Sequence, residues 1–359
     1  MKDLCLERRP SKEAIQVKIA IQSPRNPYDL LKASTMSEHQ EWALPKSIQI
    51  KPKALEFDLQ PALDSLVFIH MEAFEDGLTA NTLGTQRNGY GVVISAQGTI
   101  LTIGYLITEA SKIWITTNKG VVVPGFTLAY DQATGFGLIQ PLGALECSHL
   151  EMGSSDTLEL PQKAYALGHG GVAHSMETQI IAQQEFVGFW EYLIEDALYT
   201  TPAHPRWCGA ALVDTLGRLI GIGSLLVQQE SKGEVVECNM FVPIDLLKPI
   251  LNDLINTGQT SAAARPWLGI YTVEAEGQLI ISFITPGSPA EKAGIKDGDQ
   301  VVKVGLDRVF TLSQLWQAIW KLGQAGVKVP LSLARDGELI HITLTSVDRN
   351  SLLKKPMMH

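Results

Sequence analysis

Short runs of β-branched and aromatic residues, separated by glycine and Asn/Asp turns, follow one another between residues 63 and 245. This texture is typical of the strands of an all-β protein. The runs fall into two sets of about six, which favours a double barrel over a single sandwich. We expect strands at 65–71, 89–95, 99–103, 112–116, 120–126 and 136–140, and then at 163–167, 178–184, 198–201, 218–227 and 238–242.

The pattern changes after residue 243. Apolar residues recur at helical spacing up to Gly258, a natural helix C-cap, and predict an amphipathic helix that closes the β region. The small, polar segment 259–265 is typical of a linker. A separate α/β unit follows over 266–348, and we expect strands at 268–273, 279–283 and 300–304, a short helix after Pro289, a helix over 312–322, and two final strands.

The N-terminal residues lack this periodicity. Residues 1–61 are charged and interrupted by prolines, which predicts a partly disordered arm that Trp42 and Phe57 could pin to the rest of the protein. We therefore divide the chain into an arm (1–61), a double-barrel domain (62–258), a linker (259–265), an α/β domain (266–348) and a tail (349–359).

Composition narrows the function. A formal net charge of −9 disfavours a nucleic-acid partner, because phosphate binding needs a basic face. The four cysteines show no CxxC pair and no metal-like spacing, so we expect free thiols, a reducing compartment, and no metal or cofactor. No apolar run approaches the ~20 residues of a membrane span, and no signal peptide is visible, so a cytoplasmic location is expected.

Three segments of the α/β unit carry distinctive motifs: 266–270 (PWLGI), 287–299 (GSPAEKAGIKDGD) and 334–337 (ARDG). Together with the order of the elements, they resemble the HtrA/Deg family of trypsin-like proteases with a C-terminal PDZ domain, over roughly residues 62–346. The first segment resembles the carboxylate-binding loop of that PDZ domain, and the other two resemble its signature and its final hairpin. The resemblance implies a mainly β fold, in which a chymotrypsin-like double β-barrel is followed by an α/β PDZ domain.

In the barrel region the family frame is present, but its catalytic residue types are replaced. Tyr105 follows two segments, 89–94 and 98–102, that resemble the strands before the catalytic histidine, and it stands at the histidine position. Gly135 stands at the aspartate position. In the segment 206–212 (RWCGAAL), which resembles Gly-x-Ser-Gly-Gly-Pro-Leu, Cys208 falls on the nucleophile and Arg206 on the glycine of the oxyanion hole.

These replacements predict a loss of catalysis. Acyl transfer needs an activated nucleophile, an oriented base and donors for the oxyanion. Tyr105 is a poor base, since a phenol has a pKa of about 10. Gly135 has no side chain that could orient a base, and we expect Arg206 to be strained in a conformation that glycine adopts freely.

Cysteine is the one replacement that keeps a nucleophile. The alternative is therefore an active endopeptidase that uses Cys208 with a displaced histidine, for which His204, His169 and His174 are the candidates. A thiolate needs a nearby cation or base, so we favour the interpretation of Cys208 as a partly buried thiol in a vestigial pocket.

The PDZ-like unit keeps the features of a peptide groove. A PDZ domain adds a peptide C-terminus as an extra strand, and its loop amides bind the terminal carboxylate. The resemblance assigns the loop to Trp267, Leu268, Gly269 and Ile270 and the opposite wall to Leu312, Trp316 and Ile319. Two arrangements stay open: either Trp316 or Trp320 faces the groove, or both cover the barrel domain in a closed state.

The sequence thus predicts a catalytically inactive HtrA-like protein that binds C-termini or extended segments of partner proteins, as a scaffold, adaptor or chaperone-like factor. The resemblance implies a homo-trimer or a mixed oligomer with a related protein. A third interpretation is a structural subunit of a larger complex, docked by the N-terminal arm.

Overall fold

The first barrel contains six antiparallel strands that close in the order β1-β2-β3-β6-β5-β4. The computed structural model describes residues 42–231 and 234–355. Apolar side chains fill the barrel, and two of its strands are buried along nearly their whole length. Its strands are β1 (Leu66–Ala73), β2 (Gln86–Val93), β3 (Ile100–Ile103), β4 (Ala110–Thr117), β5 (Val122–Tyr130) and β6 (Phe136–Pro141).

The second barrel closes in the order β10-β11-β12-β9-β8-β7. Two of its strands, β8 and β9, form a hairpin that is much longer than the expected strands at 178–184 and 198–201. The strands are β7 (Gln162–Leu167), β8 (Ser175–Gly188), β9 (Tyr192–Thr201), β10 (Ala211–Val213), β11 (Leu219–Ser231) and β12 (Glu234–Pro243).

The C-terminal domain is a sheet in the order β13-β14-β15-β17-β18, with β16 paired to β15. Ser288 and Thr311 cap its two helices, because each side chain accepts a hydrogen bond from the backbone N–H three residues later. The elements are β13 (Ile270–Ala275), β14 (Gln278–Ile284), α6 (Pro289–Lys292), β15 (Gln300–Val304), β16 (Asp307–Arg308), α7 (Leu312–Lys321), β17 (Lys328–Arg335) and β18 (Glu338–Thr345).

Short helices connect the strands and lie around the barrels. The expected helix before Gly258 is broken, because a 3-10 turn precedes the regular helix α5. These helices are η1 (Pro52–Ala54), α2 (Leu59–Asp64), α3 (Ala80–Leu83), α4 (Gly104–Ile107), η2 (Gly171–His174), η3 (Ile244–Leu246), α5 (Leu251–Thr257) and η4 (Arg349–Ser351).

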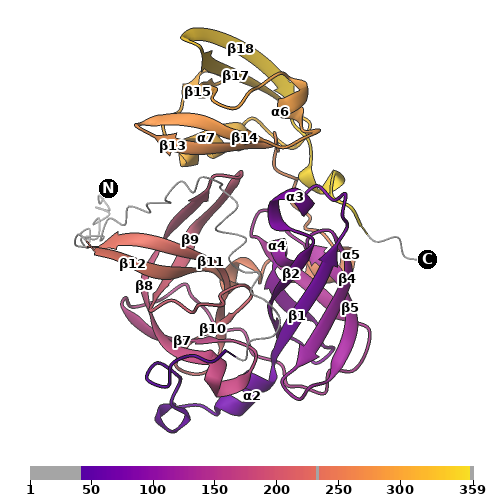
Figure 1. Cartoon of the computed structure of the whole chain (residues 1–359), viewed down its shortest axis with the longest axis vertical. Coiled ribbons are helices and arrows are strands. Elements are labelled where there is room, and N and C mark those ends of the chain that lie inside the picture. Colours follow the sequence, from indigo (N-terminus) through magenta and orange to yellow (C-terminus); the bar gives the residue numbers. More distant parts are fainter. Residues whose placement is uncertain (1–41, 232–233, 356–359) are drawn as a thin grey trace, which may run out of the picture.

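The β8–β9 hairpin joins the second barrel to the C-terminal domain. In Figure 1 the C-terminal domain lies above the two barrels, and β9 rises from the second barrel towards β13 and α7. Phe189, between β8 and β9, is buried in the apolar core of the C-terminal domain rather than in that of its own barrel. The two domains therefore share side chains.

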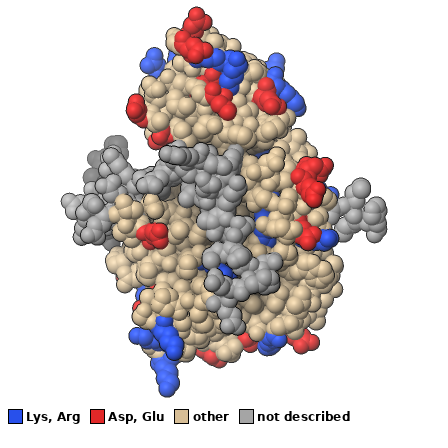
Figure 2. All heavy atoms as spheres, in the orientation of Figure 1, with Lys and Arg blue, Asp and Glu red and all other residues tan. Residues whose placement is uncertain are grey.

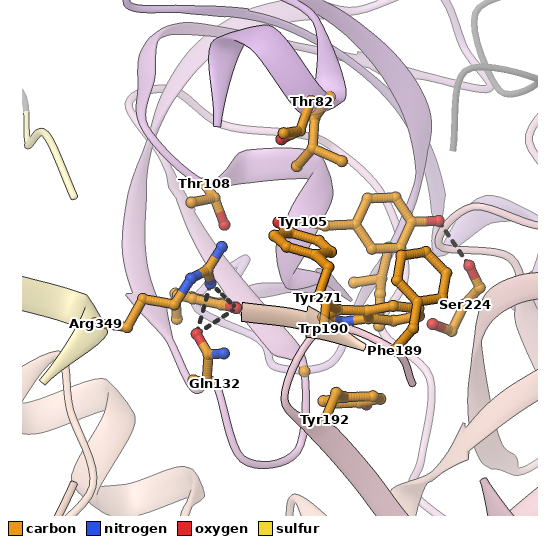
Figure 3. Close-up of a pocket in the computed structure, with 14 residues that line it drawn as sticks. Thr82, Tyr105, Thr108, Gln132, Phe189, Trp190, Tyr192, Ser224, Tyr271 and Arg349 are labelled. Carbon is orange, nitrogen blue, oxygen red and sulfur yellow. Dashed lines mark hydrogen bonds between the residues drawn. The ribbon is translucent and has the colours of Figure 1, made fainter. Parts of the chain in front are cut away.

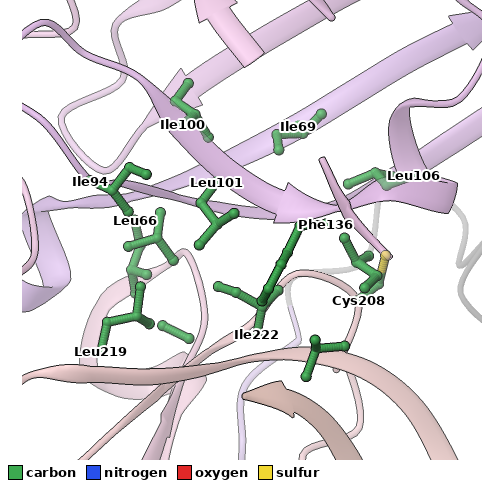
Figure 4. Close-up of a cluster of buried hydrophobic side chains, with 14 of the residues drawn as sticks. Leu66, Ile69, Ile94, Ile100, Leu101, Leu106, Phe136, Cys208, Leu219 and Ile222 are labelled. Carbon is green, nitrogen blue, oxygen red and sulfur yellow. The ribbon is translucent and has the colours of Figure 1, made fainter. Parts of the chain in front are cut away.

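One apolar cluster runs through both barrels. Leu66 and Ile100 of the first barrel and Leu219 and Ile222 of the second belong to it, all fully buried. Figure 4 shows that Cys208 lies among these aliphatic side chains. The segment predicted as the nucleophile loop is therefore part of a core.

The described part of the N-terminal segment packs on the second barrel. The Trp42 ring contacts His174 edge-on at 4.6 Å between centroids, and the Phe57 ring lies 5.9 Å from Tyr165. Residues 42–61 are thus held by the anchors that the sequence indicated. The rest of the expected arm, 1–41, lies outside the described residues.

Charged side chains of both signs are interspersed on the face seen in Figure 2, with no continuous basic patch. Within residues 42–231 and 234–355, no helix has the length and apolar character needed to cross a bilayer.

Candidate active-site cleft and peptide groove

Tyr105 lies in α4, where the two barrels meet. The Gly104 N–H donates to the Gly135 carbonyl at 2.7 Å, which brings the two predicted triad positions close together. The Tyr105 hydroxyl donates to the backbone carbonyl of Ser224 in β11 at 2.7 Å. Burial raises the pKa of Tyr105 well above 10, so this phenol stays protonated and serves as a hydrogen-bond donor between the barrels.

Gly135 is held in a turn that excludes a side chain. Its φ is +80°, a conformation that favours glycine. A Cβ built on Gly135 would lie 2.6 Å from the hydroxyl of Tyr192. That hydroxyl is itself fixed, because it donates to the Thr134 carbonyl at 2.7 Å. An aspartate could not occupy this position without displacing Tyr192.

Cys208 precedes β10 by three residues and is buried, with 5% of its surface exposed. Burial raises the pKa of its thiol to about 12, although Tyr105 and Arg87 act in the opposite direction. Arg87 is itself buried and donates to the carbonyls of Tyr105 and Thr108, both at 2.9 Å. It therefore holds the backbone around Tyr105, a role that no motif indicated.

The three histidines that the sequence offered as displaced bases differ in their partners: both ring nitrogens of His204 are engaged, whereas His169 Nε2 and His174 Nδ1 are buried without a hydrogen-bond partner among the described residues. His204 is fully buried, and its Nε2 lies 3.0 Å from the His174 carbonyl while its Nδ1 accepts from the Arg206 N–H at 3.1 Å. Burial lowers the pKa of His204 to about 4. The His174 ring lies against Trp42 and the His169 ring against Phe68. None of the three contributes to the pKa of Cys208.

The expected strain at Arg206 is not observed. Arg206 is not among the described non-glycine residues with positive φ. Its guanidinium lies over the Trp42 ring, 4.4 Å from the centroid, in a cation–π contact. The prediction was wrong because the loop turns one residue after Cys208, at Gly209 with φ +73°, and leaves Arg206 in an ordinary conformation.

A small aromatic cavity remains in the cleft. Its volume is about 70 Å³, less than half of the ~150 Å³ that holds a benzene-sized guest in a protein interior. Tyr105 and Gly135 line it from the first barrel, and Phe189 and Trp190 line it from the β8–β9 hairpin. Figure 3 shows the aromatic rings crowded on one side and Arg349 on the other. Arg349 donates to the Tyr130 hydroxyl and to the Gln132 side chain.

The loop predicted to bind a carboxylate does hold one, from within the same chain. The N–H groups of Leu268, Gly269 and Ile270 donate to the carboxylate of Glu191 at 3.0, 2.7 and 3.1 Å. Gly269 is required here, because its φ is +84° and a Cβ would lie 2.3 Å from the Ser288 side chain. The groove is therefore occupied, which the sequence did not indicate.

The helix wall of the groove also contacts the hairpin. The Trp316 indole N–H donates to the Gly188 carbonyl at 2.9 Å, so Trp316 is the tryptophan that faces the groove. Trp320 lies outside it, under the Arg265 guanidinium at 4.2 Å. Leu312 and Ile319 are buried in the same apolar cluster as Phe189. Trp316 therefore contacts the hairpin of the second barrel, whereas Trp320 does not, so the arrangement in which both tryptophans cover the barrel domain is not the one observed.

The described residues contain no group of three or more His, Cys, Asp or Glu side chains placed to hold a metal ion. Cys147, Cys208 and Cys238 are free thiols, and Cys5 lies outside the described residues.

Two family models match the chain, in line with this architecture. Residues 89–222 match the trypsin-like peptidase domain and residues 266–345 match the PDZ domain. The protein is thus a trypsin-like double barrel joined to a PDZ domain.

Curated relatives match most of the chain. The chain is 26% identical over 275 residues to a "probable periplasmic serine endoprotease DegP-like" of Chlamydia trachomatis, covering 72% of this chain and 53% of the relative. It is 24% identical over 277 residues to the serine endoprotease DegS of Haemophilus influenzae, covering 74% and 77%. The chain belongs to the HtrA family.

Solved structures agree in fold. An HtrA-type protease, an AlgW variant solved with a tripeptide, superposes with a TM-score of 0.51 at 18% identity, covering 83% of this chain and 97% of that one. The chain spans about half of the length of the DegP-like relatives that it matches.

The cytoplasmic location expected from the sequence is contradicted by these relatives. Proteins of this kind from Chlamydia trachomatis and Escherichia coli are named periplasmic endoproteases. The expectation rested on the absence of a visible signal peptide in residues 1–41, which the structure does not describe.

Proposed function

We propose that this chain is a catalytically inactive member of the HtrA family that acts by binding C-terminal or extended segments of partner proteins. The state of the Cys208 thiol carries the first half of the proposal. A thiol with a pKa of about 12 is almost entirely protonated at neutral pH, and the thiolate is the form that attacks a carbonyl.

The surroundings of Cys208 support inactivity. A base must be oriented towards the nucleophile, but both ring nitrogens of His204 are engaged with backbone groups. The Tyr105 hydroxyl donates to a backbone carbonyl and keeps its proton. Gly135 offers no carboxylate, and Tyr192 fills the space where one would lie.

Turnover of an unfolded protein tests this half. Purified wild type and the Cys208→Ala variant should both leave casein intact over hours at 37 °C, while an active HtrA protease under the same conditions degrades it. Fragments from wild type, absent with Cys208→Ala, would refute inactivity and favour a cysteine endopeptidase.

The loop of Leu268–Ile270 supports the second half. Three converging N–H groups already bind a carboxylate, which is the chemistry that recognises a peptide C-terminus in a PDZ domain. A peptide with a free C-terminus should bind, and the same peptide with an amidated C-terminus should not. Equal binding of both would place recognition elsewhere in the molecule.

The assembly and the location belong to the same proposal. Because two of the relatives are named periplasmic endoproteases, we place the partners of this protein in the periplasm. The family resemblance implies a homo-trimer or a mixed oligomer, which light scattering of the purified protein, alone and with a related HtrA protein, would detect.

A further inference from the structure

The segment Gly188–Glu191 lies in the PDZ groove as a peptide ligand would. The carboxylate of Glu191 accepts from three successive N–H groups of the loop, with the closest contact to Gly269 at 2.7 Å. It is a side-chain carboxylate in the middle of the chain, 77 to 79 residues from the loop that binds it.

The backbone of the segment pairs with the groove strand. The Thr272 N–H of β13 donates to the Phe189 carbonyl at 2.9 Å. Phe189 precedes the carboxylate-bearing residue by two positions, and Thr272 follows the last loop amide by two positions. In an extended peptide that adds a strand to β13, backbone hydrogen bonds to the strand recur every two residues, which is the spacing observed here.

The side chain of Phe189 fills the apolar part of the groove. Only 4% of its surface is exposed, and it belongs to a cluster with Leu268, Ile270 and Ile319. On the helix wall, the Trp316 indole donates to the Gly188 carbonyl at 2.9 Å, and the Ser313 hydroxyl donates to the Glu185 carboxylate at 3.0 Å. One hairpin therefore contacts the strand wall (β13), the helix wall (α7) and the carboxylate-binding loop of the groove.

Glu191 is a costly residue for a purely structural contact. Its φ is +60°, in the left-handed region that a residue with a side chain rarely adopts. Its carboxylate is buried, and no ion pair among the described residues involves it. Burial raises the pKa of Glu191 to about 7, although the three amides and Arg349 act in the opposite direction.

We propose that residues 188–191 are an internal ligand of the PDZ groove, and that a partner binds by displacing them. This inference rests on the proposed peptide-binding function. The ligand chemistry is a carboxylate placed two residues after an aromatic side chain, supplied either by a C-terminus or by a glutamate side chain in a hairpin. We take the C-terminus as the partner, because it brings the carboxylate without the left-handed backbone that Glu191 requires.

The test uses the full chain, the Glu191→Gln variant and a matched control, Glu195→Gln. Glu195 is an exposed glutamate four residues further along β9. The probes are a labelled peptide ending in Phe-Trp-Val with a free carboxyl end, its amidated form, and a head-to-tail cyclic peptide with the sequence of residues 186–192, which has no C-terminus. The readouts are fluorescence polarisation and hydrogen exchange of the amides of residues 268–272.

The loss of the charge should free the groove. We expect hydrogen exchange at residues 268–272 to accelerate in Glu191→Gln. The affinity for the free-carboxyl peptide should rise about tenfold or more, because the apparent affinity is proportional to the fraction of molecules whose groove is open. Wild type and Glu195→Gln should behave alike. Stronger binding of the cyclic peptide than of the linear one would overturn the choice of a C-terminal partner.

Two outcomes separate this inference from the proposed function. Unchanged exchange and unchanged affinity in Glu191→Gln would overturn the internal ligand and leave peptide binding in place. Faster exchange with no peptide bound by any variant would overturn peptide binding, and with it the displacement. If Glu191→Gln does not fold, Phe189→Ala tests the same contact, with the same expected rise in exchange.

Discussion

The inertness of Cys208 is the prediction that most directly separates a binding protein from an enzyme. Burial raises the pKa of this thiol to about 12 from an ordinary value of 9.0. At pH 8 the thiolate fraction is then about 10⁻⁴, against about 10⁻¹ for an ordinary thiol. Three pKa units correspond to about 4 kcal/mol, so alkylation of Cys208 should be about 10³-fold slower before steric protection is added.

Timed alkylation with iodoacetamide, followed by mass spectrometry of the cysteine peptides, measures this rate. Cys147 is the internal control, because it is partly exposed in the same molecule, although partial burial also raises the pKa of its thiol. In the folded protein at pH 8, Cys147 should be modified while Cys208 stays unmodified, and in guanidinium the two rates should converge. Alkylation of folded Cys208 at the rate of Cys147, with an inflection near neutral pH, would refute the reasoning and reveal an activated thiol.

Two further predictions concern the frame around the cleft. Gly209→Ala should lower the free energy of unfolding by about 3 kcal/mol or more in a urea titration, because a Cβ at Gly209 would lie 1.9 Å from the Tyr90 carbonyl. The control is Gly120→Ala. Gly120 also has a positive φ, but a Cβ there would meet nothing within 4 Å, so the substitution should cost only about 1 kcal/mol. Stability should also fall by up to about 3 kcal/mol as the pH drops from 6.5 to 4, because the folded-state pKa of His204, about 4, lies below its unfolded value and protonation favours unfolding. His204→Gln should flatten this pH dependence of stability, whereas the control His149→Gln, at an exposed site, should not. Equal losses of stability in Gly209→Ala and Gly120→Ala would contradict the steric argument. Equal stability–pH curves of the two histidine variants would contradict the assignment of the pH dependence to His204.

The strands were predictable from short runs of β-branched and aromatic residues bounded by glycine and Asn/Asp turns, a pattern that the sequence carries. It failed for β8 and β9, whose outer halves leave the barrel and contact another domain, so that Gln183, Gln184 and Glu185 break the expected pattern. β10, Ala211–Val213, was missed as a strand because it is short and lies within the RWCGAAL motif.

The binding residues show a similar division. The loop at Leu268–Ile270 was predictable from the resemblance of segment 266–270 to the carboxylate-binding loop of the family, and Gly269 there has the left-handed backbone that glycine favours. Glu191 was not predictable, since its partners are 77 residues or more away and no local pattern distinguishes a buried glutamate from an exposed one. Sequence identifies which loop can bind a carboxylate, whereas only the fold shows which carboxylate is there.

The tip of the β8–β9 hairpin contacts both the groove and the cleft, so we expect changes at the two sites to be coupled. Glu191 lies in the groove, and its neighbour Trp190 lines the cavity beside Tyr105 and stacks on Tyr192 at 5.9 Å with an angle of 8°. The Tyr192 hydroxyl in turn fills the space next to Gly135. Displacement of the tip by a peptide would therefore remove one wall of the cavity, and an acidic side chain at position 135 would push on Tyr192 and on the stacked Trp190. We therefore expect that restoring the family's residue types at positions 105, 135 and 208 would not restore the cleft, because Tyr192 of the hairpin occupies the space next to Gly135.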